Sequence, residues 1–323
     1  MESLQEFAAR EMQEISYQPI LPADEKSYDA LLKGAFGVPE EGSFFDDFPV
    51  WRSGHGVPFY RIGAFGSDRL LLSAASARTA YLQLGIEQLK VGILGGVVTA
   101  PEAQGKGYAS QCVRACEEWL RKQGAAFVIL WSGDPEWYLK KGYAIAGHQY
   151  RIPLSVFSSL PAAYSSLSAG DLRQGWCSGI GQQFLQRRTG LKVQSWDLDW
   201  IKEHRNTFWY WLGNESEVKA FAAIHRGVDL KNTIHEWSGD PDALRALFFL
   251  LNQDQPDLQL MGNTTVLRKA GILFDESASE PVALVKLLNE REWKMGVRTP
   301  VENWLQFLNR REVPFWLWGL DAG

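Results

Sequence analysis

A glycine-containing turn directly after an apolar run is the part of this sequence whose residue types point to chemistry. The apolar run ends in Val97, Val98 and Thr99, and Pro101 stops it. The turn that follows reads Gln104, Gly105, Lys106, Gly107, Tyr108, Ala109, Ser110. Where glycines remove the Cβ, successive backbone N–H groups can converge on an anion, and a following helix adds its positive end. The turn is therefore a candidate cradle for a pyrophosphate, with Lys106 adding charge.

Two familiar phosphate cradles do not fit these residues. A P-loop ends in Gly-Lys-Ser/Thr, whereas Lys106 is followed by Gly107 and Tyr108. A dinucleotide fingerprint needs a glycine or alanine three residues after its second glycine, and that position is Ser110. The remaining pattern is Gln-x-x-Gly-x-Ala directly after a strand.

The elements that position the turn form a β-α-β unit. The unbroken apolar run over 91–99 is typical of a strand that is buried on both faces. Helical spacing of Cys112, Val113, Cys116 and Leu120 predicts an amphipathic helix that starts at the turn. Residues 125–131 then read as the next buried strand.

This unit resembles the acetyl-CoA-binding core of the GNAT acyltransferases. Gln104, Gly107 and Ala109 match the defining positions of their Arg/Gln-x-x-Gly-x-Gly/Ala motif. Residues 137–143, Trp-Tyr-Leu-Lys-Lys-Gly-Tyr, resemble the later Phe-Tyr-x-x-x-Gly-Phe segment of the family. The resemblance covers residues 91–143 closely and 15–155 loosely. It implies the GNAT fold, a mixed central sheet flanked by helices, in the α+β or α/β class.

The resemblance also implies an activity, which is transfer of the acetyl group of acetyl-CoA to an amine of a small molecule or peptide. Tyr138 would protonate the departing thiolate as general acid, although a purely structural tyrosine is the competing interpretation. A backbone N–H near Val97–Thr99 would polarise the thioester oxygen. The residues implied to hold acetyl-CoA are Val97, Val98, Thr99, Gln104, Gly105, Lys106, Gly107, Tyr108, Ala109 and Ser110.

The group that removes the proton from the amine stays open at this point. Glu87 is expected on or beside the strand that runs along the cofactor, and Asp46, Asp47 and His55 lie in an aromatic loop that could border the acceptor. A relay through water is the further alternative. The identity of the acceptor is also open, because acceptor pockets are built from loops without a shared motif.

The second half of the chain echoes the first, with strands, then a helix, then a strand. Its turn at 237–242, Trp-Ser-Gly-Asp-Pro-Asp, carries two acids and a proline that lacks an N–H group, and is thus unsuited to a pyrophosphate. We therefore expect an acetyltransferase domain over 1–155 and a degenerate GNAT-like domain without a cofactor site over 165–323. An unrelated α+β domain is the alternative. Strands are expected to close the two domains at Tyr143–Ile152 and at Pro314–Trp318.

Composition limits the other possibilities. The chain has 323 residues, 46% of them hydrophobic and 22% charged, with a net charge of −5 that argues against a nucleic-acid partner. Its three cysteines favour neither a disulfide framework nor a metal site. Residues 2–14 read as an amphipathic helix without a signal core, and no run is long enough to span a membrane, so a cytoplasmic protein is expected. A non-catalytic acyl-CoA sensor and an interaction module remain alternatives, and the oligomeric state is open.

Overall fold

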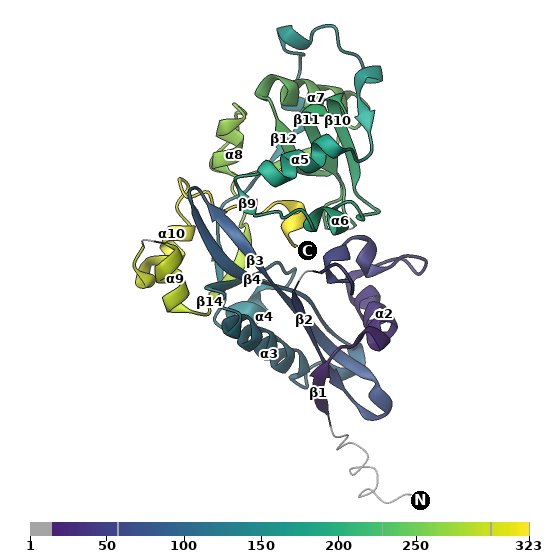
Figure 1. The fold of residues 1–323 in the computed structure, drawn as a ribbon, viewed down its shortest axis with the longest axis vertical. Coiled ribbons are helices and arrows are strands. Elements are labelled where there is room, and N and C mark those ends of the chain that lie inside the picture. Colours follow the sequence, from purple (N-terminus) through teal and green to yellow (C-terminus); the bar gives the residue numbers. More distant parts are fainter. Residues whose placement is uncertain (1–14, 57, 228, 298, 323) are drawn as a thin grey trace, which may run out of the picture.

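The computed structural model describes residues 15–56, 58–227, 229–297 and 299–322, so the helix predicted for 2–14 lies outside the described residues. Two mixed sheets stand one above the other in Figure 1, each flanked by helices. The architecture is the mixed α+β fold that the sequence predicts. The C-terminal end of the chain lies between the two sheets.

The first sheet has the order β1-β2-β3-β4-β5-β14-β6, with β9 pairing β3 off this path. Its strands are β1 (Ser16–Pro19), β2 (Phe59–Phe65), β3 (Leu71–Leu84), β4 (Glu87–Thr99), β5 (Phe127–Leu130), β6 (Ala144–Ala146), β9 (Gly190–Leu191) and β14 (Ala283–Leu287). The helices around it are α2 (Glu25–Phe36), α3 (Tyr108–Lys122), α4 (Pro135–Leu139), α9 (Glu290–Gly296) and α10 (Trp304–Leu308). Only β4 and β5 run parallel, because α3 crosses over between them.

The second sheet has the order β7-β13-β12-β11-β10-β8. Its strands are β7 (Tyr150–Pro153), β8 (Arg173–Gln174), β10 (Phe208–Asn214), β11 (Glu217–Ile224), β12 (Thr233–Gly239) and β13 (Gln259–Gly262). The helices of this half are α5 (Ser178–Gln186), α6 (Asp197–Ile201), α7 (Pro241–Asp254) and α8 (Thr264–Lys269). Here β12 and β13 form the parallel pair, joined through α7, so the β-α-β unit of the first half is repeated.

The two sheets exchange strands: the first half gives β7 to the second sheet, and the second half gives β14 and the short β9 to the first. β7 pairs with β13 in the second sheet, and β14 lies between β5 and β6 in the first. The strand predicted at Tyr143–Ile152 is therefore wrong as a closing strand of the first domain, because only β6 stays in that sheet and β7 leaves it. The sheets do not separate at the boundary predicted at 155–165, since each takes a strand from the other side of it.

The helix α3 follows the predicted pattern. Cys112, Cys116 and Leu120 are fully buried against the first sheet. Burial raises the pKa of both thiols, as expected for cysteines on the apolar face of an amphipathic helix. In the described ranges, no group of three or more His, Cys, Asp or Glu side chains is placed to hold a metal ion. None of the helices described there is long and apolar enough to cross a membrane.

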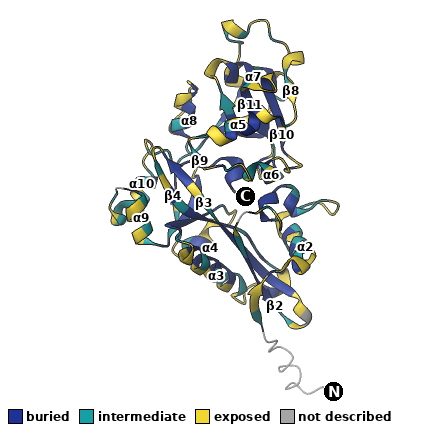
Figure 2. Cartoon of the chain, in the orientation of Figure 1, coloured by how far each residue is buried: buried dark blue, intermediate teal, exposed yellow. Residues whose placement is uncertain are grey.

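The C-terminal segment is buried between the halves, as Figure 2 shows by its dark colour. The strand predicted at Pro314–Trp318 is wrong, because these residues pair with no strand. Side chains hold parts of their backbone instead: Asn263 Nδ2 donates to the carbonyl oxygen of Phe315 at 3.4 Å, and the Asp321 carboxylate accepts from the N–H of Trp318 at 3.0 Å. Asp321 pairs with Arg187 of the second half, and its carbonyl oxygen accepts from Arg78 of β3 at 3.0 Å, so the segment contacts both halves.

Candidate active site

The predicted cradle is formed by the turn between β4 and α3. Gly105 and Gly107 have φ values of 75° and 83°, a left-handed conformation that residues with a Cβ avoid. A Cβ at either position would meet nothing within 4 Å, so the turn borders open space. Within the described part of the chain, no oxygen accepts from the backbone N–H groups of residues 105–110. Six successive free donors at the start of a helix, beside the exposed Lys106, fit a pyrophosphate.

The strand before the cradle parts from its parallel neighbour. β4 pairs with β5 only at Gly92 and Ile93, so the edge of β4 from residue 94 to 99 has no partner on that side. A bulge lies in the same stretch, because Gly96 and Val97 together face Ala75 of β3. The parting leaves backbone groups of β4 available to a thioester oxygen.

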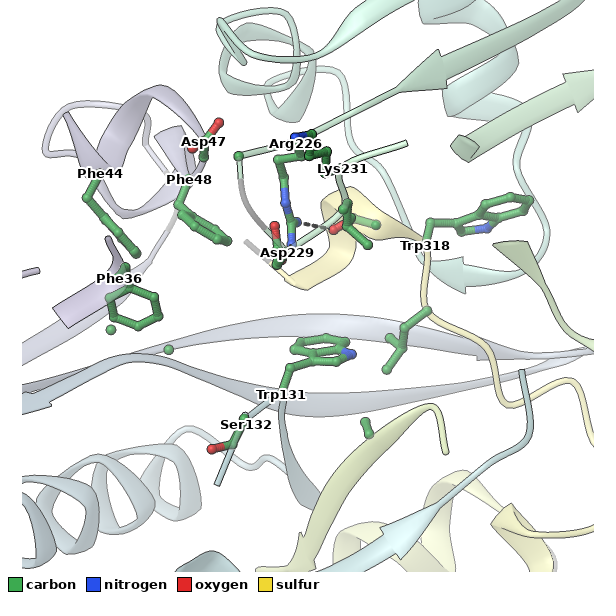
Figure 3. Close-up of a pocket in the computed structure, with 18 of the residues that line it drawn as sticks. Phe36, Phe44, Asp47, Phe48, Trp131, Ser132, Arg226, Asp229, Lys231 and Trp318 are labelled. Carbon is green, nitrogen blue, oxygen red and sulfur yellow. Dashed lines mark hydrogen bonds and ion pairs between the residues drawn. The ribbon is translucent and has the colours of Figure 1, made fainter. Parts of the chain in front are cut away.

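A cavity of about 1000 Å³ opens from this parting. Residues of the β4 bulge and Tyr138 line one end, and residues 225–227 and 229–231 of the second half line the other. Figure 3 shows Trp131 and Ser132, which follow β5, facing Arg226 across the space. Among the predicted site residues, Val97 and Tyr138 lie in the cavity. The cradle lies on the surface beyond it, and Ser73 binds the Val98 carbonyl and the Thr99 hydroxyl.

Tyr138 lies on α4 and is 7% exposed. Burial, with a smaller effect of Asp134, raises the pKa of its phenol well above the usual value of 10. The hydroxyl makes no hydrogen bond with any residue that the structure describes, although the side chain lines the cavity. A protonated, unpartnered phenol at this place can donate a proton to a group in the cavity.

The four candidate bases differ in their position relative to the cavity. Glu87 begins β4 beside the turn from β3, eight residues from Gly95, or about 26 Å at ~3.3 Å per residue. Glu87 therefore lies on β4, as expected, but at the end of the strand away from the cavity, which it does not line. Asp46 pairs with Arg205 at 3.4 Å and His55 with Glu203 at 3.4 Å, and neither lines the cavity. Asp47 does line it and is 7% exposed.

The second half holds the loop that carries Asp47. Asn206 Nδ2 donates to Asp47 Oδ1 at 2.8 Å, and the N–H of Arg205 donates to the carbonyl oxygen of Asp46 at 3.0 Å. Arg52 approaches Glu203 at 3.9 Å. The wall of the cavity opposite β4 is thus a joint product of both halves.

The counterpart of the cradle in the second half has no free donors of this kind. Asp240 caps α7 and accepts from the N–H groups of Asp242 and Ala243 at 3.0 and 3.2 Å. Pro241 occupies the first position of the helix. A carboxylate of the chain therefore already takes the place in which an anion would bind.

Several cavity residues were not predicted from the sequence. Asn206, Arg226, Asp229 and Lys231 come from loops of the second half. Arg226 is 2% exposed, pairs with Asp229 and stacks 4.7 Å from the ring centre of Phe48. The sequence gives one indication of them. A charged residue and a glycine, Arg226 and Gly227, follow closely after an apolar run that reads as a buried strand.

Comparisons with known proteins agree with this geometry. The model of the acetyltransferase (GNAT) domain matches residues 16–146. A comparison with curated proteins finds no match.

Three solved structures share the fold across most of the chain. A GCN5-related N-acetyltransferase from Kribbella flavida is 17% identical, with a TM-score of 0.61 over 88% of this chain and 73% of that one. A probable N-acyltransferase from Enterococcus faecalis V583 is 15% identical, with a TM-score of 0.60 over 86% of this chain and 74% of that one. Eis1 from Mycobacterium abscessus is 15% identical, with a TM-score of 0.52 over 85% of this chain and 73% of that one. At these identities the likeness concerns the fold. Residues 16–146 thus match the GNAT acetyltransferase domain, and the rest of the chain shares the fold of these structures.

Proposed function

We propose that the protein transfers the acetyl group of acetyl-CoA to an amine of a small molecule or peptide. The observation that carries this proposal is the row of six unbonded N–H groups at 105–110, next to the unpaired edge of β4. The first feature suits the pyrophosphate of CoA, and the second suits a thioester carbonyl. The cavity beyond Val97 supplies the space for an acceptor.

The residues divide the chemistry between them. The nitrogen of the neutral amine forms a bond to the acetyl carbon, while N–H groups of the β4 edge stabilise the oxyanion. The carbon–sulfur bond then breaks, and Tyr138 gives its proton to the thiolate. The amine nitrogen loses one proton as it becomes an amide, and this proton restores the phenol, so the net products are the N-acetyl compound and CoA thiol. Because the pKa of Tyr138 is raised, its phenol carries the proton at neutral pH.

We further propose that the second half is a GNAT-like unit without its own cofactor site. Its parallel pair β12 and β13 and the helix α7 repeat the arrangement of β4, β5 and α3. Asp240 and Pro241 remove the donors that a pyrophosphate needs. The role of this half is to complete the wall of the acceptor cavity through Asn206 and Arg226.

Two measurements test the proposal. Calorimetry with acetyl-CoA, CoA, AMP and NAD determines whether the protein prefers CoA, and we expect one CoA site per chain. Release of CoA thiol in the presence of an amine library then measures turnover. Binding without turnover of any amine would favour a sensor, and no preference for CoA would favour an interaction module.

A further inference from the structure

We propose that Asp47 binds the ammonium group of the acceptor, and that the acceptor is a cationic amine with an apolar body about the size of an aromatic ring. The inference rests on the proposed function and specifies its substrate class. It comes from the surroundings of one buried carboxylate, from the rings beside it and from the pairing of the nearby arginine.

The Asp47 carboxylate is held on one side only. Oδ1 accepts from Asn206 Nδ2 at 2.8 Å, whereas Oδ2 accepts no hydrogen bond from a described residue and is still accessible. Gly227 packs beside it, since a Cβ at that position would lie 2.5 Å from Oδ2. The free oxygen therefore lies at the cavity wall, between the 44–48 loop and the second half.

No cation of the described residues lies within 4 Å of Asp47 in an ion pair. Arg226, which also lines the cavity, is directed to Asp229 at 2.5 Å and to the carbonyl oxygen of Gly319. Burial raises the pKa of Asp47 above its usual value. The Asn206 hydrogen bond and the charge of Arg226 offset this effect of burial only in part. Because no cation contacts Oδ2, an ammonium group bound there would relieve the remaining cost.

Aromatic rings form the wall next to the carboxylate. Phe44 and Phe48 stack with their ring centres 4.6 Å apart, and Phe36 lies 5.0 Å from Phe44. Figure 3 shows these three rings at one side of the cavity and Asp47 above them. The rings favour an apolar body, and their faces favour a cation over an anion. Arg226 already covers the ring of Phe48 from the other side.

A charge series of matched ligands tests the inference. With CoA present, calorimetry compares 2-phenylethylamine, 2-phenylethanol and phenylacetate, which differ mainly in charge. We expect the cation to bind about 10- to 100-fold more tightly than the alcohol, the size of a charge-assisted hydrogen bond. The anion should bind weakest. In Asp47→Asn, the difference between cation and alcohol should vanish.

The control is Asp197→Asn. Asp197 is also a carboxylate held by neutral donors, the N–H of Gln194 at 2.7 Å and the indole of Trp200 at 3.1 Å, but it lies outside the cavity. This variant should keep the cation preference. If Asp47→Asn fails to fold, as its melting curve would show, the charge series on the unmodified protein still decides the matter.

Three results would overturn the inference. They are equal binding of cation and alcohol by the unmodified protein, tightest binding of phenylacetate, which the exposed Lys231 would explain, and an equal loss for all three ligands in Asp47→Asn. Failure of the proposed function would look different, because CoA itself would then not bind to the unmodified protein. Intact CoA binding without a cation preference removes only the assignment of Asp47.

Discussion

The rings of Tyr138 and Tyr143 pack edge to face, with centroids 5.5 Å apart and planes at 78°, yet their hydroxyls have different surroundings. Tyr143 donates to Glu117 at 2.9 Å, and Lys286 binds the same carboxylate. Tyr138 has no such partner and lines the cavity. Of these two neighbouring phenols, Tyr138 is therefore the candidate for catalysis and Tyr143 has a structural role.

Removing each hydroxyl in turn should show this difference. Tyr138→Phe should leave acetyl-CoA affinity unchanged and lower kcat by roughly 10²–10⁴-fold, the usual contribution of a positioned general acid. Tyr143→Phe is the matched control, and it should keep kcat while losing about 1.5–3 kcal/mol of stability, because it removes a hydrogen bond to a carboxylate. Turnover, affinity and melting temperature are measured on both. A Tyr138→Phe enzyme with normal kcat would exclude the catalytic assignment.

The cradle provides a second prediction. Gly107→Glu should abolish CoA binding, because its side chain fills the open space and its charge repels phosphate. Gly175→Glu is the control, since Gly175 also has a positive φ, 92°, and open space around it, but lies in the second half. Both variants carry the same backbone strain, so melting temperatures should fall alike while only the first loses CoA by calorimetry. Unchanged CoA affinity in a folded Gly107→Glu protein would remove the cofactor assignment.

The parts of the site that the sequence predicts are local in the chain. The cradle depends on glycines and a helix start within a few residues, so its conformation follows from the residue types at 104–110. The position of Tyr138 at the cavity likewise follows from a motif one helix and one strand away. These features need no knowledge of how distant strands pair.

The rest depends on contacts between residues far apart in the sequence. Asp47 and Asn206 are 159 residues apart, and nothing in the residue types near either one indicates the other. The exchange of β7 and β14 is equally hidden, because a short apolar strand does not specify its neighbour. The distance of Glu87 from the cavity is hidden for a related reason, since it depends on the length of β4 and on which of its ends faces the cavity.

Stoichiometry tests the account of the second half. Because Asp240 caps α7 with its own carboxylate, we expect one equivalent of CoA per chain in a titration. Asp240→Ala would leave the cap unpaired and cost ~1 kcal/mol of stability, without creating a second site, since Pro241 still lacks an N–H group. Two equivalents bound to the unmodified protein would contradict this account.

Acid should destabilise the fold through two buried histidines. Burial lowers the pKa of His204 and of His235 to about 3, from an ordinary value of 6.5. The unfolded chain therefore binds more protons between these values, and stability falls as the pH drops from 6.5 towards 3.

His235 donates to the carbonyl oxygen of His225 at 2.7 Å and packs on Gly319. In His235→Gln, the slope of unfolding free energy against pH should decrease by about 1.4 kcal/mol per pH unit, the value for one proton. Urea unfolding across this range measures it, and an unchanged slope would refute the prediction.

The strand exchange predicts that neither half is stable alone. A fragment of residues 1–155 lacks β14, so β5 loses its neighbour and β6 is left without any strand to pair with. The same fragment carries β7 without β13, and its short apolar strand would be exposed. We expect this fragment to aggregate or to melt without a cooperative transition, and to bind no CoA, although it contains the whole cradle. Circular dichroism and calorimetry on the fragment and the full chain make the comparison.

A control fragment of residues 1–155 joined by a flexible linker to residues 280–297 restores β14 and α9 beside β5, and it should regain part of the cooperative transition. A fragment 1–155 that folds and binds CoA as the full chain does would show that the first sheet is complete without β14.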